Sequence, residues 1–109
     1  MKRIFYASGS VVTGDRTAAA VLAYARALAM RETSDSIDIP VVTPAGTEGR
    51  AQLVIGPASQ LMVVTEVMDR DELDDDDAIA AIDKHVEGLL TPESRPLDPG
   101  QFDENLDTD

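Results

Sequence analysis

The sequence of 109 residues contains no cysteine and no long apolar run. Without cysteine there can be no disulfide bond and no thiolate zinc site, and the absence is typical of a cytoplasmic protein. No apolar stretch approaches the roughly 20 residues that a membrane-spanning helix needs. The apolar residues after Lys2 and Arg3 are interrupted at Ser8 and Gly9, too early for a signal peptide. We therefore expect a cytoplasmic protein that does not enter a membrane.

Basic residues are scarce in the last part of the chain. Fifteen of the 21 acidic residues follow residue 66, against three basic ones, so the whole net charge of −12 lies there. Such a surface repels nucleic acids and anionic membranes, because both carry fixed negative charge. A partner bound electrostatically would have to present a basic surface or be a cation. The simplest interpretation of the acids is solubility.

The length suits a single domain, and the composition divides it in two. Residues 1–90 hold nearly all the large apolar side chains and predict an α+β globular domain. Residues 91–109 form an acidic, proline-containing tail whose composition is typical of a disordered segment. If the tail docks on the domain or on a second copy, Phe102 and Leu106 are its anchors.

Residues 50–67 hold the densest run of large apolar and β-branched side chains. We expect two strands here, residues 50–55 and 60–66, joined by a tight turn with Pro57 at its second position. Residues 37–42 predict a strand that forms a hairpin with residues 50–55, and Pro40 marks it as an edge strand or as bulged. These three strands are predicted to form a meander. Apolar residues on both faces of residues 60–66 indicate a central strand or a face covered by a second copy.

The first strand is predicted at residues 3–8, with a bulge or close approach at Gly9 and an extension through Val11 and Val12. A first helix should follow over residues 16–31, capped by Thr13 or Asp15. Its core-facing stripe is expected to consist of small and aliphatic residues at helical spacing: Ala18, Val21, Leu22, Ala25, Leu28 and Ala29. The opposite side is rich in alanine, which is consistent with cover by a second copy or by the tail.

A second helix is predicted over residues 78–90, capped by one of the aspartates before it. Its buried stripe is apolar throughout: Ile79, Ile82, Val86, Leu89 and Leu90. The predicted order is therefore β-α-β-β-β-α, a mostly antiparallel sheet with helices packed on it.

One stretch has the composition of an anion site. Residues 8–17 combine hydroxyls, glycines and a helix start, which together can bind a phosphate. The candidate ligand-binding residues are Ser8, Ser10, Thr13 and Arg16. No phosphate-loop or dinucleotide motif is present, and Asp15 would repel an anion, so an ordinary capped turn explains the same residues.

Other candidates for chemistry are weaker. The aspartates from residue 69 to 77 fail the EF-hand pattern, because Leu73 occupies its fifth position and no glycine follows. His85 has no nucleophile placed beside it by any motif, so it is interpreted as a lone surface histidine. We therefore expect no metal, no cofactor and no catalytic residue, and an enzyme is the less favoured interpretation.

Three functional hypotheses follow. The first is a small acidic, non-enzymatic interaction protein that binds another protein and forms a homodimer. Its candidate partner-binding residues are Asp74, Asp75, Asp76, Asp77, Phe102 and Leu106. The second is an acidic inhibitor or nucleic-acid mimic that occupies a basic protein surface. The third is a small-ligand binder or enzyme that uses residues 8–17.

Overall fold

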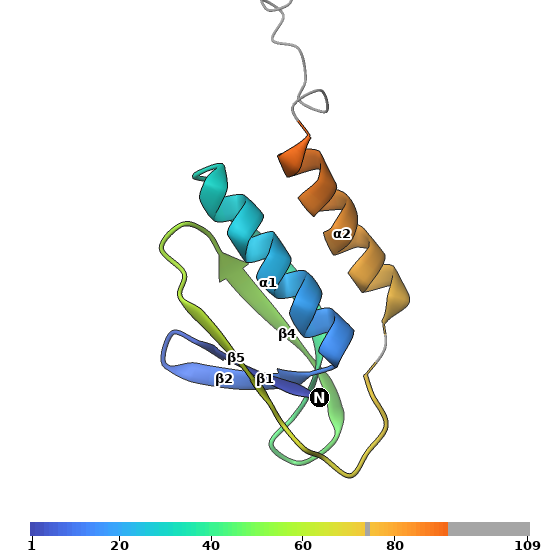
Figure 1. Cartoon of the computed structure of the whole chain (residues 1–109). Helices are drawn as coiled ribbons and strands as arrows, with labels where there is room; N and C mark the ends of the chain where they lie inside the picture. The colour runs from blue at the N-terminus through green and yellow to red at the C-terminus, as the bar shows by residue number, and fades with distance from the viewer. Residues whose placement is uncertain (74, 92–109) are drawn as a thin grey trace, which may run out of the picture.

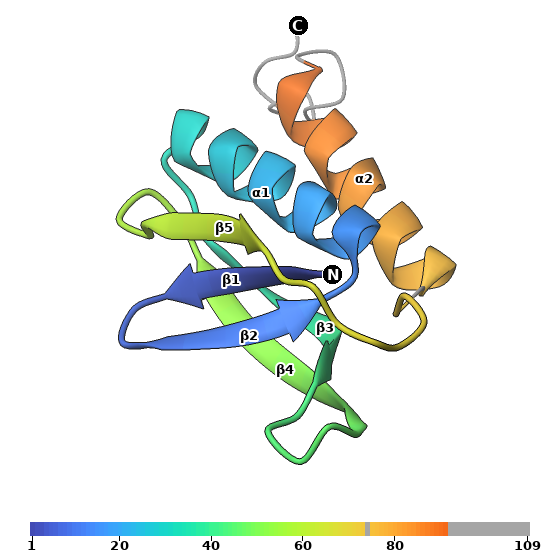
Figure 2. The same ribbon diagram turned by 60° about the horizontal axis from the view of Figure 1, so that its bottom comes forward.

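The computed structural model describes residues 1–73 and 75–91, which form one antiparallel sheet and two helices. Both helices lie on the same face of the sheet (Figures 1 and 2). This arrangement confirms the predicted α+β class. The elements follow the chain as β1 (Lys2–Tyr6), β2 (Gly9–Thr13), α1 (Asp15–Met30), β3 (Asp35–Val42), β4 (Glu48–Ile55), β5 (Leu61–Thr65) and α2 (Asp76–Leu90).

The first predicted strand is in fact a hairpin. β1 and β2 pair in antiparallel register, with Lys2 opposite Thr13 and Tyr6 opposite Gly9. The chain reverses at Ala7, which has a left-handed φ of 54°. Left-handed backbone is uncommon for alanine, and this explains why the sequence indicated a bulge rather than a turn. Gly9 is therefore the first residue of β2 and not an interruption within one strand.

The order of the strands in the sheet is β4-β3-β2-β1-β5. The predicted hairpin between β3 and β4 is confirmed, with Asp35 opposite Ile55. The predicted meander is wrong, because β4 and β5 lie at opposite edges of the sheet. The tight turn between them does form, since the amide of Ser59 donates to the carbonyl of Gly56 at 3.0 Å. β5 then pairs with β1 instead of β4.

The sheet bends where β2 meets β3. Val12 opposite Val42 is the single register pair between these strands in the described residues. β3 and β4 run across the direction of the other three strands (Figure 2). The end of β4 thus returns to the end of β1, where the hydroxyl of Tyr6 donates to the carbonyl of Val54. A short connection from β4 therefore reaches the open side of β1, and β5 forms there.

The prediction that Pro40 marks an edge strand or a bulge is wrong, because the register of β3 with β4 runs without interruption from Asp35 to Val42. β3 has β4 on one side and β2 on the other. Proline is tolerated because the pairing with β2 is confined to Val42, two residues later. The carbonyl of Pro40 accepts a hydrogen bond from the Thr13 hydroxyl at 2.6 Å.

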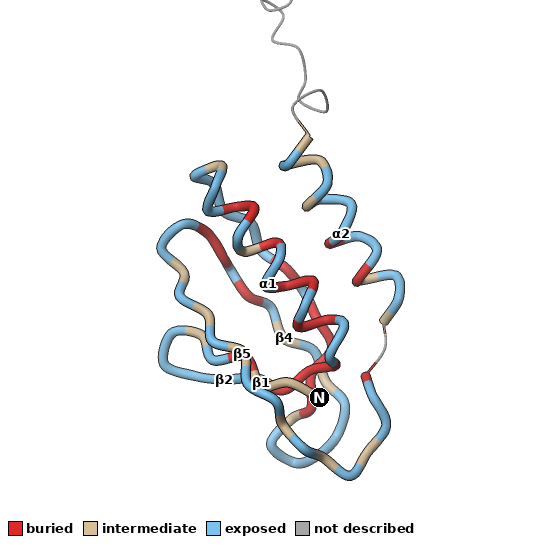
Figure 3. The backbone as a smooth tube through the Cα atoms, viewed as in Figure 1, coloured by how far each residue is buried: buried red, intermediate tan, exposed pale blue. Residues whose placement is uncertain are grey.

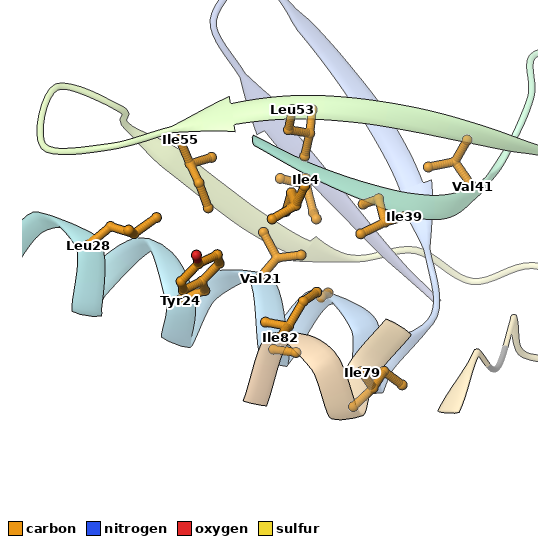
Figure 4. Packing of buried hydrophobic residues seen from close by; sticks show 13 residues of the cluster. Ile4, Val21, Tyr24, Leu28, Ile39, Val41, Leu53, Ile55, Ile79 and Ile82 are labelled. Atoms are coloured by element: carbon orange, nitrogen blue, oxygen red, sulfur yellow. The ribbon is translucent and has the colours of Figure 1, made fainter. Parts of the chain in front are cut away.

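The buried surface of α1 differs from the predicted stripe and extends onto its alanine-rich side. Tyr24 and Ala20 are buried, whereas Leu22 is 40% exposed. The reason is that α2 packs beside α1 and covers part of its alanine-rich side (Figure 1). The cover expected from a second copy or from the tail is thus supplied in part by α2. Side chains from both helices and from strands β1, β3 and β4 meet in one core (Figure 4): Ile4, Val21, Tyr24, Leu28, Ile37, Ile39, Val41, Leu53, Ile55, Ile79 and Ile82.

The two helix starts are stabilised in different ways. Asp75 caps α2, because its Oδ1 accepts from the amide of Ala78 at 3.0 Å, and this confirms that an aspartate is the cap. The prediction that Thr13 or Asp15 caps α1 is wrong. Gly14 occupies the cap position of α1, and no side-chain hydrogen bond from this residue caps the helix. Glu72, far along the chain, accepts instead from the amide of Asp15 at 2.8 Å.

The connector before α2 lies so close to α1 that it requires a glycine. A Cβ at Gly14 would stand 2.4 Å from the carbonyl oxygen of Leu73. The Glu72 carboxylate also accepts from the amino group of Met1 at 2.9 Å. The start of the chain, the start of α1 and the connector are thereby held together.

Candidate functional site

The outer face of β1 and β5 carries three exposed apolar side chains. Phe5 lies opposite Met62 in the register, and Val64 follows two residues later on the same face. Phe5 is 38% exposed, Met62 56% and Val64 42%. Ile4 and Val63 alternate with them and face the core and helix α1. We call Phe5, Met62 and Val64 the β1–β5 patch.

The β1–β5 patch includes the apolar residues that the sequence places on the second face of residues 60–66. Two explanations were open, a central strand or a face covered by a second copy. The first is wrong, because β5 is an edge strand with β1 as its only neighbour in the described sheet. Figure 3 shows β5 as a strand without any buried residue. Its outward apolar side chains are therefore not explained by burial within the described residues.

Polar groups border the β1–β5 patch. The guanidinium of Arg3 donates to both carboxylate oxygens of Glu66, from Nε at 3.1 Å and from Nη2 at 3.0 Å. Its Nη1 donates to the hydroxyl of Ser10 at 2.9 Å. The hydrogen bonds from Arg3 lower the pKa of Glu66, and the same contact raises the pKa of Arg3. An apolar centre with a polar border that is already paired is typical of protein-binding surfaces.

A second feature is a hollow of about 180 Å³ between α1, β3 and α2. Tyr24, Asp35 and His85 line it, one from each element. The Tyr24 hydroxyl donates to Oδ2 of Asp35 at 2.5 Å. Burial, together with this hydrogen bond, raises the pKa of Tyr24 to about 12. The same bond lowers the pKa of Asp35.

His85 is exposed, as the sequence indicated, but it is not isolated. Its ring centre lies 5.9 Å from that of Tyr24, and its Nδ1 is 2.8 Å from the carbonyl oxygen of Ala81. No sequence signal could have joined these residues, since they come from three separate elements. In the described part of the chain no hydrogen bond links His85 to Asp35 or to Ser36, which also lines the hollow. The arrangement therefore joins α1, β3 and α2 through a ring contact and a partly buried hydrogen bond.

The predicted ligand-binding residues do not form one loop, because β2 lies in the middle of the stretch. Ser8 lies in the hairpin turn, and Ser10 faces Arg3 on the outer face. Thr13, at the other end of β2, is fully buried and bonded to Pro40. Arg16, in the first turn of α1, forms an ion pair with Asp76 at 2.8 Å. The structure thus brings Ser10 close to the β1–β5 patch and separates it from Thr13 and Arg16.

The predicted acidic partner-binding residues lie at the start of α2. Asp75 caps the helix and also binds Nη1 of Arg50 at 3.0 Å, and Asp76 binds Arg16. Asp77 is exposed in the first turn. Three of the predicted residues lie outside the described part of the chain: Asp74, Phe102 and Leu106. The two paired aspartates therefore have structural roles that neutralise part of their charge locally.

No known family model, curated protein or solved structure matches the chain. In the residues that the structure describes, no group of three or more acidic, histidine or cysteine side chains is placed to hold a metal ion. Within the same residues, neither helix combines the length and the apolar character needed to cross a membrane. The site must therefore be interpreted from its own geometry.

Proposed function

We propose that this chain is a small, non-enzymatic interaction protein that binds another polypeptide through the β1–β5 patch and the adjoining edge of β5. The observation that carries the proposal is the presence of three exposed apolar side chains beside an edge strand that contains no charged residue. Contiguous apolar surface on a small protein commonly marks an interaction site.

The geometry fits recognition by strand addition. A polypeptide segment that pairs with an exposed sheet edge gains main-chain hydrogen bonds, while alternate side chains contact the face of the sheet. The β5 edge supplies the main-chain groups, and Phe5, Met62 and Val64 supply the apolar contact. An extended segment with alternating apolar side chains is therefore the class of partner that this surface fits.

Charge sets further limits on the partner. The acids of the last third of the chain favour a partner with a neutral or basic surface and disfavour nucleic acid and anionic membrane. Lack of cysteine supports a cytoplasmic location. The acidic inhibitor and the small-ligand binder stay predictions, and the pairing of Asp75 with Arg50 and of Asp76 with Arg16 gives neither of them support.

The test is capture of partners from host lysate by three tagged proteins: the wild type, Met62→Lys and Met30→Lys. Met62 and Met30 are both exposed methionines, at 56% and 69%, but Met30 lies at the end of α1, away from β5. The proposal expects a polypeptide, a copy of this chain included, that the wild type and Met30→Lys recover and Met62→Lys does not. Equal recovery by all three proteins, or recovery of nothing by any, would overturn it.

A further inference from the structure

The free side of β5 exposes backbone groups in a defined pattern. The amide of Glu66 donates to the carbonyl of Met1 at 2.9 Å, and these two residues continue the register of β1 and β5. In an antiparallel pair, a residue directs its N–H and C=O to the same side, and the next residue directs them to the other side. Val64 and Met62, two and four residues before Glu66, therefore also direct their backbone groups to β1. The remaining three residues direct their groups to the free side: Leu61, Val63 and Thr65.

This edge lacks the features that usually prevent pairing with another chain. Edge strands are commonly protected by charged side chains, proline or a bulge. β5, with the sequence Leu-Met-Val-Val-Thr, contains no charged residue and no proline, and its register with β1 contains no bulge. β4, at the opposite edge, carries Glu48 and Arg50. The two edges of the sheet thus differ, and only β5 is suited to pairing.

In the described part of the chain, the charged groups beside β5 are paired. The acids of α2 lie beyond α1, which contacts both α2 and β5 (Figure 2). Beside β5, Glu66 is neutralised by Arg3 at 3.0 Å, and Lys2 donates to the Thr65 hydroxyl at 3.0 Å. The acid that directly follows β5, Glu66, is therefore already paired when two copies approach through this strand.

We infer that the β5 edge is occupied by β5 of a second copy, antiparallel, with the two-fold axis at Val63. This inference rests on the proposed function and names the partner. Val63 then lies opposite Val63 of the second copy, and Leu61 opposite its Thr65. In this register each of these opposed pairs exchanges two backbone hydrogen bonds, because all three residues direct their backbone N–H and C=O groups away from β1.

The same register also joins the two apolar surfaces. Met62 lies opposite Val64 of the second copy on the outer face, so the β1–β5 patches of both copies become continuous, with Phe5 at each side. An antiparallel strand is complementary to itself about a two-fold axis, which makes the contact closed rather than open-ended. The sheet continues through both chains. One strand and three exposed side chains form a small interface, and small interfaces belong to weak, transient complexes.

The first measurement is sedimentation equilibrium of the full chain over a series of protein concentrations, for the wild type, Thr65→Pro and Thr65→Ala. Proline removes the amide hydrogen that points to the free side but leaves the bonds of β5 to β1, and proline is tolerated on an edge strand. Thr65→Ala removes the same side chain and keeps the amide. The wild type and Thr65→Ala should dimerise, and the dissociation constant of Thr65→Pro should rise at least tenfold.

Amide exchange followed by NMR tests the register in the unaltered protein. The amides of Leu61, Val63 and Thr65 should become protected as concentration rises, while those of Met62 and Val64 are protected at every concentration. A chain that stays monomeric, or a Thr65→Pro variant that is folded and dimerises as the wild type does, would overturn the inference. If the chain is monomeric and Met62→Lys still loses a captured partner, the proposed function stands with a different occupant at the edge.

Discussion

At the scale of single residues, Glu72 connects segments that are far apart in the sequence. Its hydrogen bonds from the Asp15 amide and from the Met1 amino group lower the pKa of its carboxyl below the ordinary 4.5. A group with a lowered pKa in the folded chain stabilises the fold above its ordinary pKa, and loses this effect as the pH falls through the folded value. The Met1 amino group has a raised pKa, so its contribution is complete below pH 8.0 and is lost at higher pH.

We predict that Glu72→Gln lowers the melting temperature at pH 7 and that the difference from the wild type disappears as the pH falls well below 4.5. The amide can still accept from Asp15, but the charge that pairs with the Met1 amino group is gone. Thermal denaturation across pH would measure this effect. Glu87→Gln, the same change at an exposed position of α2, is the control and should leave the melting temperature at pH 7 nearly unchanged. Equal shifts in both variants would contradict the assigned role of Glu72.

The residue scale also shows why the candidate site was only partly predictable. Met62 and Val64 were recognisable as apolar residues on the second face of a strand, since alternation is visible in the sequence. Phe5 joins them only because β1 is the neighbour of β5. Its exposure depends on strand order, which local spacing does not contain. Tyr24, Asp35 and His85 meet for the same reason.

At the scale of elements, α2 is held to the domain by few deeply buried side chains. Ile79 and Ile82 are its two buried residues, and both join the core. The guanidinium of Arg31, at the end of α1, donates to the carbonyl of Leu89 at 2.6 Å. The attachment of α2 is therefore mainly apolar, with polar contacts near its ends.

We predict that Ile82→Ala lowers the free energy of unfolding by about 2–4 kcal/mol, because a buried isoleucine leaves a cavity when it is shortened. Chemical denaturation would measure the loss. Leu90→Ala is the matched control on the same helix, where the side chain is 50% exposed, and should change the value by about 0.5 kcal/mol or less. Similar losses in both variants would mean that α2 is not anchored as described.

The elements themselves were largely predictable, and the reasons are local. The period of apolar residues placed both helices, and the aspartates before α2 correctly indicated a cap. The hairpin at Ala7 was not predictable, because alanine gives no turn signal. The cap of α1 was also hidden, since the group that accepts from Asp15 belongs to Glu72, 57 residues later.

At the scale of the whole molecule, the main core of the described residues draws on the sheet and on both helices. Its buried members end at Ile82, and the partly buried ones at Leu89. Residues after 91 contain six acids and one base.

We predict that a chain ended after Thr91 keeps its far-ultraviolet circular dichroism and changes its free energy of unfolding by about 0.5 kcal/mol or less. Removing net negative charge should, if anything, stabilise it slightly at low salt. Denaturation of both chains at low and high salt would measure this. A loss of stability that persists at high salt would show that the tail docks on the domain through Phe102 or Leu106.

Strand order was the main feature of the whole molecule that the sequence could not supply. The tight turn at Gly56 and Pro57 suggested that the strands on either side of it were partners. The bend at Val12 and Val42 instead carries β5 to the other edge. Because such a bend depends on the packing of the two parts of the sheet, adjacency in the chain was a poor guide to adjacency in the sheet.

The pairing of β1 with β5 affects how the chain folds during synthesis. Lys2 and Thr65 are partners in this ladder, 63 residues apart. Because of this separation, β1 leaves the ribosome well before β5. Until β5 emerges, one side of β1 has no partner, and closing so long a loop slows folding relative to a helical protein of similar length. A nascent chain is therefore most open to contact with chaperones, or with other nascent chains, at β1.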